Sequence, residues 1–319
     1  MTTFDNAFAI GVDLGGTTVK TGLVSSKGEI VYQNRFDSKG DQGPERVIRQ
    51  IAHSVKDAME HQGGRQIAGI GIGAPGVVDN NGCVKAPPNL LHWDAIPLAN
   101  ELQKEFQGVV INVENDANCA AIAESRFGIG REYPDFLFII WGTGIGGGII
   151  LNRKLFRGPT GGAGEVGHIC IDHEGPLCGC GAQGCVEAFI GQKYLSHRTI
   201  EKIKNQPSSL IVKLVGGDFD KIEPIYISQA AQAGDELARS ILVEAGTLLG
   251  VAVGGVMNTM DLRVSIIGGG VSAAGDLVIN AVRDSVRAHV LKPLREDIRV
   301  FQSELGNNAG ILGAAGLVL

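Results

Sequence analysis

Residues 13–20 read DLGGTTVK, and this stretch decides how the N-terminal part of the chain is interpreted. The surrounding pattern predicts a strand over 9–14 and a second strand over 19–24. Two glycines let backbone N–H groups face an anion, and an aspartate at a strand end can hold Mg²⁺ through water. The stretch therefore predicts a turn that binds phosphate oxygens, with an ordinary glycine-rich hairpin as the alternative. Its predicted binding residues are Asp13, Gly15, Gly16, Thr17, Thr18 and Lys20.

The same arrangement returns in the second half of the chain. A predicted strand over 136–141 leads into GTGIGG at 142–147, and a further strand follows at 148–151. Each copy of strand, glycine turn and two more strands is followed by helices and strands in alternation. This duplication predicts an α/β fold of two lobes, each built on a βββαβα core, with a cleft between them. We expect the two turns to grip one phosphate chain, which adds Thr143 and Gly144 to the ATP site.

Two of the glycine runs imitate a dinucleotide-binding fingerprint. Residues 71–76 and 142–147 both match GxGxxG. That fold requires a helix directly after the glycines, but residues 77–82 and 148–152 read as strand and turn, which excludes it. A third run, Gly268, Gly269 and Gly270, ends a predicted buried strand. It suits the nucleoside of a nucleotide, because a flat base or ribose can lie against backbone that carries no Cβ atoms.

Length and composition limit the class of protein. The chain has 319 residues, enough for two lobes, which we place at 1–118 and 119–304 with a C-terminal helix at 305–319 packing back on the first. The net charge of −6 and the lack of a Lys/Arg cluster argue against a nucleic-acid partner. Neither a signal peptide nor an apolar run of membrane-spanning length is evident, so we expect a cytoplasmic protein without a membrane partner.

Asp116 lies where a predicted strand over 109–113 gives way to a helix that runs to about residue 127. Ligands gather at such carboxyl ends of parallel strands. One interpretation is that Asp116 only caps the helix. The other is that it accepts the proton of a bound hydroxyl that attacks phosphorus.

A cysteine cluster gives the strongest local signal. Three of the six cysteines lie within eight residues, which favours a metal site in a reducing compartment over a disulfide framework. With one histidine they form the tetrahedral set of a closed, structural Zn²⁺ site, whose predicted ligands are His168, Cys178, Cys180 and Cys185. His173 is the alternative histidine. Glu165 and Glu187 flank the cluster and are interpreted either as solvated carboxylates or as acceptors for sugar hydroxyls.

These features together resemble the ROK family, which comprises sugar kinases and some transcriptional repressors. The motifs that carry the resemblance are 13–17 (DLGGT), 142–148 (GTGIGGG), 165–168 (EVGH) and 178–187 (CGCGAQGCVE). The resemblance covers nearly the whole chain and implies an actin-like, hexokinase-type fold related to ribonuclease H. It also implies that Asp116 is the general base. The positions that match the family's sugar contacts are Gly73, Asn89, Asn115, Asp116, Glu165, His168 and Glu187.

We therefore expect an ATP-dependent kinase that phosphorylates the 6-hydroxyl of a hexose, with ATP, Mg²⁺ and structural Zn²⁺. Glucose is the leading substrate, and N-acetylmannosamine or N-acetylglucosamine is the alternative. The resemblance also implies a homodimer or homotetramer. Rival interpretations are a sugar-responsive repressor, for which no helix-turn-helix is seen before Asp13, a non-catalytic sugar sensor, and an actin-like ATPase. Trp141 and Ile190-Gly191 depart from the family pattern and bear on sugar preference.

Overall fold

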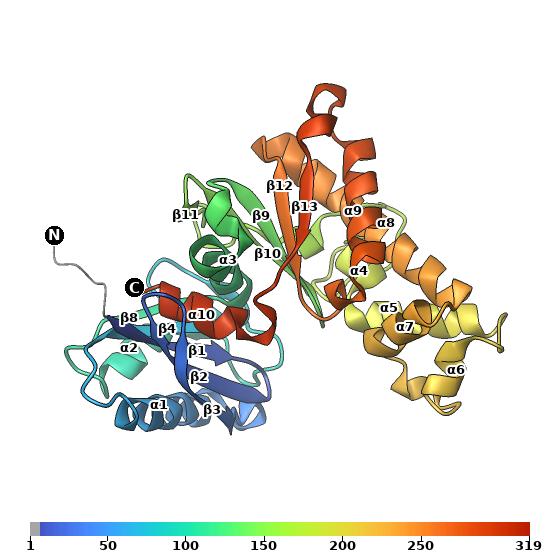
Figure 1. The fold of residues 1–319 in the computed structure, drawn as a ribbon. Helices are drawn as coiled ribbons and strands as arrows, with labels where there is room; N and C mark the ends of the chain where they lie inside the picture. Colours follow the sequence, from blue (N-terminus) through green and yellow to red (C-terminus); the bar gives the residue numbers. More distant parts are fainter. Residues whose placement is uncertain (1–6) are drawn as a thin grey trace. The chain divides into compact units, whose positions relative to one another are not determined.

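The computed structural model describes residues 7–319, and their contacts group into two compact units (Figure 1). The first unit contains the residues up to 134, together with 148–164 and 305–319, and the second contains 135–147 and 165–304. Helix α3 (Asp116–Phe127), which spans the boundary expected after residue 118, lies wholly in the first unit.

The first unit is built on a five-stranded sheet with the order β3-β2-β1-β4-β8. Strand β1 pairs antiparallel with β2 and parallel with β4, and β4 pairs parallel with β8. The strands are β1 (Phe8–Leu14), β2 (Thr18–Ser25), β3 (Ile30–Asp37), β4 (Ile67–Ala74) and β8 (Ile111–Asn115). A small sheet adds β5 (Val77–Val78), β6 (Val84–Lys85) and β7 (Ala95–Ile96), beside helix α2 (Leu98–Gln103).

Helices cover both faces of this sheet. Helix α1 (Pro44–Glu60) begins with a proline at its first turn and buries Val47, Ile51 and Val55 in the same core as the side chains of Ile10 and Val12. Because strand side chains alternate, Gly11 faces the opposite side, where helix α10 (Ala309–Gly316) packs on β1 and β4 (Figure 1). The C-terminal helix therefore packs with the N-terminal strands.

The second sheet has the order β11-β10-β9-β12-β13, which repeats the connectivity of the first. Its strands are β9 (Phe136–Trp141), β10 (Ile145–Leu151), β11 (Lys154–Leu155), β12 (Val264–Gly268) and β13 (Arg299–Gln302). The helices of the second unit are α4 (Glu187–Ile190), α5 (Gln192–Ile203), α6 (Leu210–Leu214), α7 (Pro224–Gln232), α8 (Glu236–Met260) and α9 (Asp276–His289). The predicted two-lobed α/β fold with a duplicated core is confirmed.

Helix α8 corrects one expectation. The sequence analysis expects no apolar run of membrane-spanning length, yet α8 has 25 residues and a window with a mean hydropathy of 1.8. More than half of that window is buried inside the protein. Glycines let α9 approach closely, since a Cβ at Gly250 would lie 2.4 Å from the Cβ of Ser285. The packing identifies α8 as a core helix of this unit.

We predict that Gly71→Ala destabilises the protein by about 3 kcal/mol, the upper end of the cost of overpacking. A Cβ at Gly71 would lie 1.7 Å from the carbonyl oxygen of Ala314, so α10 would have to move away from the sheet. Urea unfolding measures the effect. The control is Gly255→Ala on α8, where an added Cβ meets nothing within 4 Å and helix propensity should raise stability by up to about 1 kcal/mol. Equal stability of Gly71→Ala and wild type would contradict this account of the packing.

Candidate active site

The first glycine turn is held by main-chain hydrogen bonds between β1 and β2. Gly15 N–H donates to the Thr18 carbonyl at 2.8 Å, and Ser38 N–H donates to the Thr17 carbonyl at 3.0 Å. The Ser38 hydroxyl also donates to the Gly16 carbonyl at 2.7 Å, so the residue that follows β3 also holds the turn in place. Thr17 itself is exposed. The turn thus keeps a fixed backbone and presents Thr17 to solvent, as a phosphate-binding turn requires.

Asp13 sits directly before this turn. It lies opposite Lys20 in the strand register, and its Oδ2 is 3.4 Å from Lys20 Nζ. Helix α10 approaches from the sheet face, where a Cβ at Gly310 would lie 2.7 Å from Asp13 Cγ. Asn89 reaches the same turn, because a Cβ at Gly16 would lie 2.7 Å from Asn89 Cβ. A predicted sugar contact and the predicted phosphate residues are therefore neighbours in this unit.

The helix that follows β8 is capped by Asn115 and not by Asp116. Asn115 Oδ1 accepts hydrogen bonds from Ala117 N–H at 2.9 Å and Asn118 N–H at 3.1 Å, and its Nδ2 donates to the Gly76 carbonyl at 2.9 Å. Asp116 is the first residue of α3, and its Oδ1 accepts from Ala117 N–H at 2.8 Å. The structure therefore rejects the interpretation of Asp116 as the cap, although the capping position was only one residue away.

A buried ion pair under this loop was missed by the sequence analysis. Glu114 is buried, and its Oε2 lies 2.5 Å from an Arg157 guanidinium nitrogen. Its Oε1 accepts from Asn115 N–H at 2.8 Å and from Asn118 Nδ2 at 3.0 Å. A charged residue at an inward position of a strand was the available signal, but its partner lies 43 positions away in the sequence. The carboxylate holds the Asn115 backbone on one side of Asp116 and the Asn118 side chain on the other.

Gly73 borders the same place from β4. A Cβ there would lie 3.2 Å from Cys119 Sγ and 3.7 Å from Asp116 Cα. Among the predicted sugar contacts of the first unit, the structure thus brings Gly73, Asn115 and Asp116 together. A larger residue at position 73 would push against the start of α3.

The second glycine turn is held by Glu187, the first residue of α4. Glu187 Oε2 accepts from Ile145 N–H at 2.8 Å, and a Cβ at Gly144 would lie 2.4 Å from that oxygen. The Gly142 carbonyl accepts from Gln192 N–H at 3.1 Å, while Thr143 is exposed. The turn is therefore fixed through its backbone and leaves the threonine accessible, as in the first unit.

Trp141 and Ile190, which both depart from the family pattern, are in contact with each other. Trp141 is fully buried, and its indole N–H donates to the Ile190 carbonyl at 2.8 Å. The run 268–270 lies against the same tryptophan, since a Cβ at Gly269 would lie 2.3 Å from the Trp141 carbonyl oxygen. Gly269 also has a φ of +92°, which only glycine adopts without strain. Trp141 therefore joins the end of α4 to the predicted nucleoside run.

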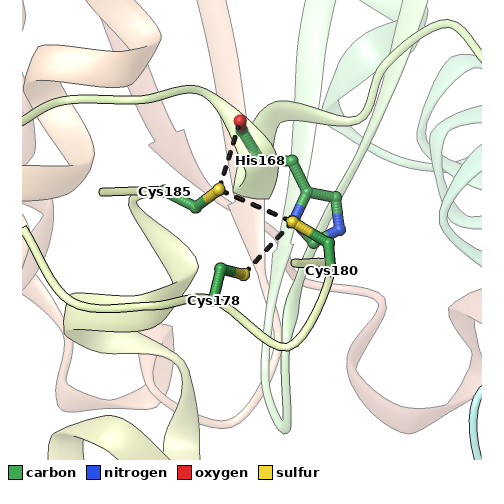
Figure 2. Close-up of side chains that lie close together, drawn as sticks. All are labelled: His168, Cys178, Cys180 and Cys185. Carbon is green, nitrogen blue, oxygen red and sulfur yellow. Dashed lines mark hydrogen bonds between the residues drawn. The ribbon is translucent and has the colours of Figure 1, made fainter. Parts of the chain in front are cut away.

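Figure 2 shows the four predicted metal ligands converging on one point. Their donor atoms all lie within 4.8 Å of one another. His168 Nδ1 is 3.7 Å from Cys178 Sγ, Cys180 Sγ is 3.7 Å from Cys185 Sγ, and Cys185 Sγ donates to the His168 carbonyl at 3.5 Å. His173, the alternative, is exposed and is not one of the four converging side chains.

The carboxylates beside the cluster differ in environment. Cys178 Sγ lies 3.9 Å from Glu187 Oε1, so Glu187 links the cluster to the second glycine turn. Partial burial raises the pKa of Glu165, with a smaller upward effect from Glu187 and an opposing effect from His168. Each predicted sugar-binding carboxylate thus interacts with a residue of the cluster, Glu165 with His168 and Glu187 with Cys178.

Comparison with known proteins finds relatives along nearly the whole chain. The sequence profile of the ROK family matches residues 9–319. A glucokinase of Thermotoga maritima is 37% identical over 310 residues, which cover 97% of this chain and 96% of that protein. A xylose repressor of Caldicellulosiruptor bescii is 31% identical over 97% of this chain, but the match covers only 77% of the repressor. A solved ROK family glucokinase from Streptomyces griseus, in complex with glucose and AMPPNP, is 36% identical with a TM-score of 0.85, covering 98% of this chain and 99% of that one.

We predict that Arg157→Ala lowers the free energy of unfolding by about 2 kcal/mol. Removing one partner of a buried pair leaves a desolvated charge, and the cost is reduced here because Arg157 is 37% exposed. Adding Glu114→Gln should recover much of the loss, since a neutral amide oxygen can still accept from Asn115 and Asn118. Lys104→Ala, which breaks an exposed pair with Glu101, is the control and should cost less than about 1 kcal/mol. A double variant no more stable than Arg157→Ala would refute this explanation.

Proposed function

The chain belongs to the ROK family, and we propose that it is an ATP-dependent glucose kinase that transfers the γ-phosphate to the sugar's 6-hydroxyl. The single observation that carries the proposal is full-length similarity to glucokinases, one of which is solved with glucose and AMPPNP. The candidate residues in both units are chemically suited to the same reaction. The family's repressors are the alternative class.

Asp116 is proposed as the general base. Because Asn115 supplies the helix cap, the Asp116 carboxylate is not required for capping. It stands in the first turn of α3, where the helix dipole favours a carboxylate. We propose that one of its oxygens accepts the proton of the attacking hydroxyl. Glu114 and Arg157 keep the loop that carries it in place.

The glycine turns are proposed to bind the nucleotide. In the first unit, the turn over residues 15–18 holds phosphate oxygens with its threonine hydroxyls and with backbone N–H groups other than that of Gly15, which donates to Thr18, and Lys20 adds positive charge. In the second unit, Thr143 and Gly144 have the same role, and the run 268–270 accommodates the nucleoside. Asp13 offers a carboxylate beside the first turn and would hold Mg²⁺ through water. When bound, that ion neutralises charge on the phosphates.

The sugar contacts are proposed for both units. The first contributes Gly73, Asn89 and Asn115, and the second contributes Glu165, His168 and Glu187. The Asn115 amide and the Glu187 carboxylate already have fixed orientations from their main-chain partners. Fixed polar groups lose little entropy when they bind sugar hydroxyls, and this favours orientation of the substrate.

The cysteine cluster is proposed to hold a structural Zn²⁺ ion. A tetrahedral ion about 2.3 Å from each sulfur spaces its ligand atoms by about 3.7 Å. The Cys180–Cys185 and His168–Cys178 separations are both 3.7 Å, so the donor set fits. When bound, zinc cross-links its four ligands and has no open position for catalysis. It would therefore position His168 and, through Cys178, Glu187.

The remaining sequence expectations are part of this proposal. We propose that the two compact units are the lobes, so that the boundary expected near residue 118 moves to residue 134 and the one near residue 304 stays. We also propose a cytoplasmic location, assembly as a homodimer or homotetramer, and no nucleic-acid partner. N-acetylmannosamine and N-acetylglucosamine are the alternative sugars. Trp141, through its bond to Ile190, is the residue whose environment bears on that choice.

The function is tested by measuring ADP release from Mg·ATP with glucose, mannose, fructose, N-acetylglucosamine and N-acetylmannosamine. We expect glucose to give the highest kcat/KM, with glucose 6-phosphate as the product. Reaction only with an acetylated sugar would keep the kinase and replace the substrate. Specific binding of DNA that a sugar relieves, without ADP release, would support the repressor class.

We predict that Asp116→Asn lowers kcat by about 10²–10⁴-fold, the contribution of a positioned base. The dissociation constant for glucose should change less than about tenfold, or 1.4 kcal/mol, because the amide oxygen can still accept from Ala117 N–H. Single-turnover kinetics and calorimetric titration separate the two effects. Asp135→Asn, in the other unit and outside the predicted site, is the control. Retained turnover in Asp116→Asn would refute the assignment of the base.

A further inference from the structure

Cys170 lies directly opposite Cys185 on a neighbouring chain segment. The two form an isolated antiparallel bridge, flanked by hydrogen bonds from Ile171 N–H to the Gly184 carbonyl and from Val186 N–H to the Ile169 carbonyl, both 2.9 Å. Because those bonds flank the pair, Cys170 and Cys185 occupy a non-hydrogen-bonded position. Cα atoms there are about 4.5 Å apart and side chains share one face. Disulfides form across Cα separations of about 4.4–6.8 Å.

The two thiols differ in exposure and in role. Cys170 is exposed and is not one of the four converging metal donors, whereas Cys185 is buried among them. Cys170 Sγ lies 3.1 Å from where a Cβ of Gly184 would stand. The same Cβ would lie 1.7 Å from the Asp172 carbonyl oxygen, so only glycine fits beside this segment. A side chain at position 184 would therefore press on the Cys170 sulfur, and the glycine leaves that sulfur unobstructed on this side.

We propose that Cys170 and Cys185 form a reversible disulfide under peroxide, and that this modification expels the metal ion. The inference rests on the zinc site of the proposed function. Loss of Cys185 as a ligand leaves three donors, too few for a closed structural site. The consequence would reach the second glycine turn, because Cys178 contacts Glu187 and Glu187 holds Ile145.

The chemistry balances with hydrogen peroxide as oxidant. The Cys170 thiolate attacks one peroxide oxygen, the O–O bond breaks, and hydroxide leaves as Cys170 becomes a sulfenic acid. Cys185, which would give up its coordinate bond to the zinc ion, then attacks the Cys170 sulfur as a thiolate, the S–O bond breaks, and a second hydroxide leaves. The two sulfurs lose two electrons in total, and peroxide is reduced to two molecules of water after protonation. A dithiol reductant reverses the bond by exchange.

Cys180 competes with Cys170 as the disulfide partner of Cys185. Cys180 Sγ is 3.7 Å from Cys185 Sγ, close enough for the two thiols to pair on oxidation. Both of these sulfurs are donors of the proposed zinc site, so their lone pairs are engaged while metal is bound. Cys170 keeps its lone pairs available and faces solvent. The metal-loaded protein should therefore oxidise first at Cys170.

The experiment uses the purified full chain, with its zinc content measured first and expected to be one ion per chain. Hydrogen peroxide is added, zinc release is followed with a chromogenic chelator, and disulfides are mapped by mass spectrometry without reduction. We expect a Cys170–Cys185 bridge to form together with zinc release, and dithiothreitol plus zinc to restore the metal content. Cys170→Ser should slow release at least tenfold, and Cys83→Ser, a free cysteine outside the cluster, should behave as wild type.

The outcomes separate the two proposals. Zinc release from Cys170→Ser at the wild-type rate, or a Cys180–Cys185 bridge in the loaded wild type, would overturn the modification. Protein isolated without zinc would contradict the metal site alone. The same mapping then still decides the thiol pair: a Cys170–Cys185 bridge supports it and a Cys180–Cys185 bridge overturns it.

Discussion

The contact of α10 with β1, β4 and α3 is the constraint on which the first unit depends. At Gly11, Gly71 and Gly313 a Cβ would lie 2.1, 1.7 and 1.7 Å from a backbone oxygen, so the helix backbone rests directly on its neighbours. The same helix touches Asp13 through Gly310 and α3 through Gly313. The last residues of the chain thus fix the positions of a carboxylate on β1 and of the helix that begins with Asp116.

In the second unit the Glu187 carboxylate joins the parts of the candidate site, as α10 does in the first unit. Glu187 binds the backbone of the glycine turn with one oxygen and contacts the cysteine cluster with the other. Glu187 therefore connects the turn to the proposed zinc site. At the other end of α4, the Trp141–Ile190 hydrogen bond connects the same helix to β9. A change in the cluster would therefore be transmitted to the second glycine turn through Glu187.

Around Asp116, neighbouring residues divide the structural and chemical tasks. Asn115 caps the helix, and Glu114, paired with Arg157, holds the backbone. The cap is formed by an uncharged amide, and the Asp116 carboxylate accepts from Ala117 N–H through its Oδ1. The buried pair is costly in itself, and its value here lies in orienting a loop, not in stability.

The sequence by itself determined the features that depend on neighbouring residues. Local periodicity and the glycine turns predicted β1, β2, β9 and the duplicated fold, and close spacing predicted the cysteine–histidine cluster whose donor atoms converge. Tertiary structure alone decided which residue caps α3, what Glu114 pairs with, that Asn89 meets Gly16, and that Cys170 opposes Cys185. It also decided that α8 is a core helix, since its composition suits a membrane equally well. The reason is physical: periodicity reflects which face of an element is buried, whereas pairings between distant residues depend on strand order and on the path of the loops.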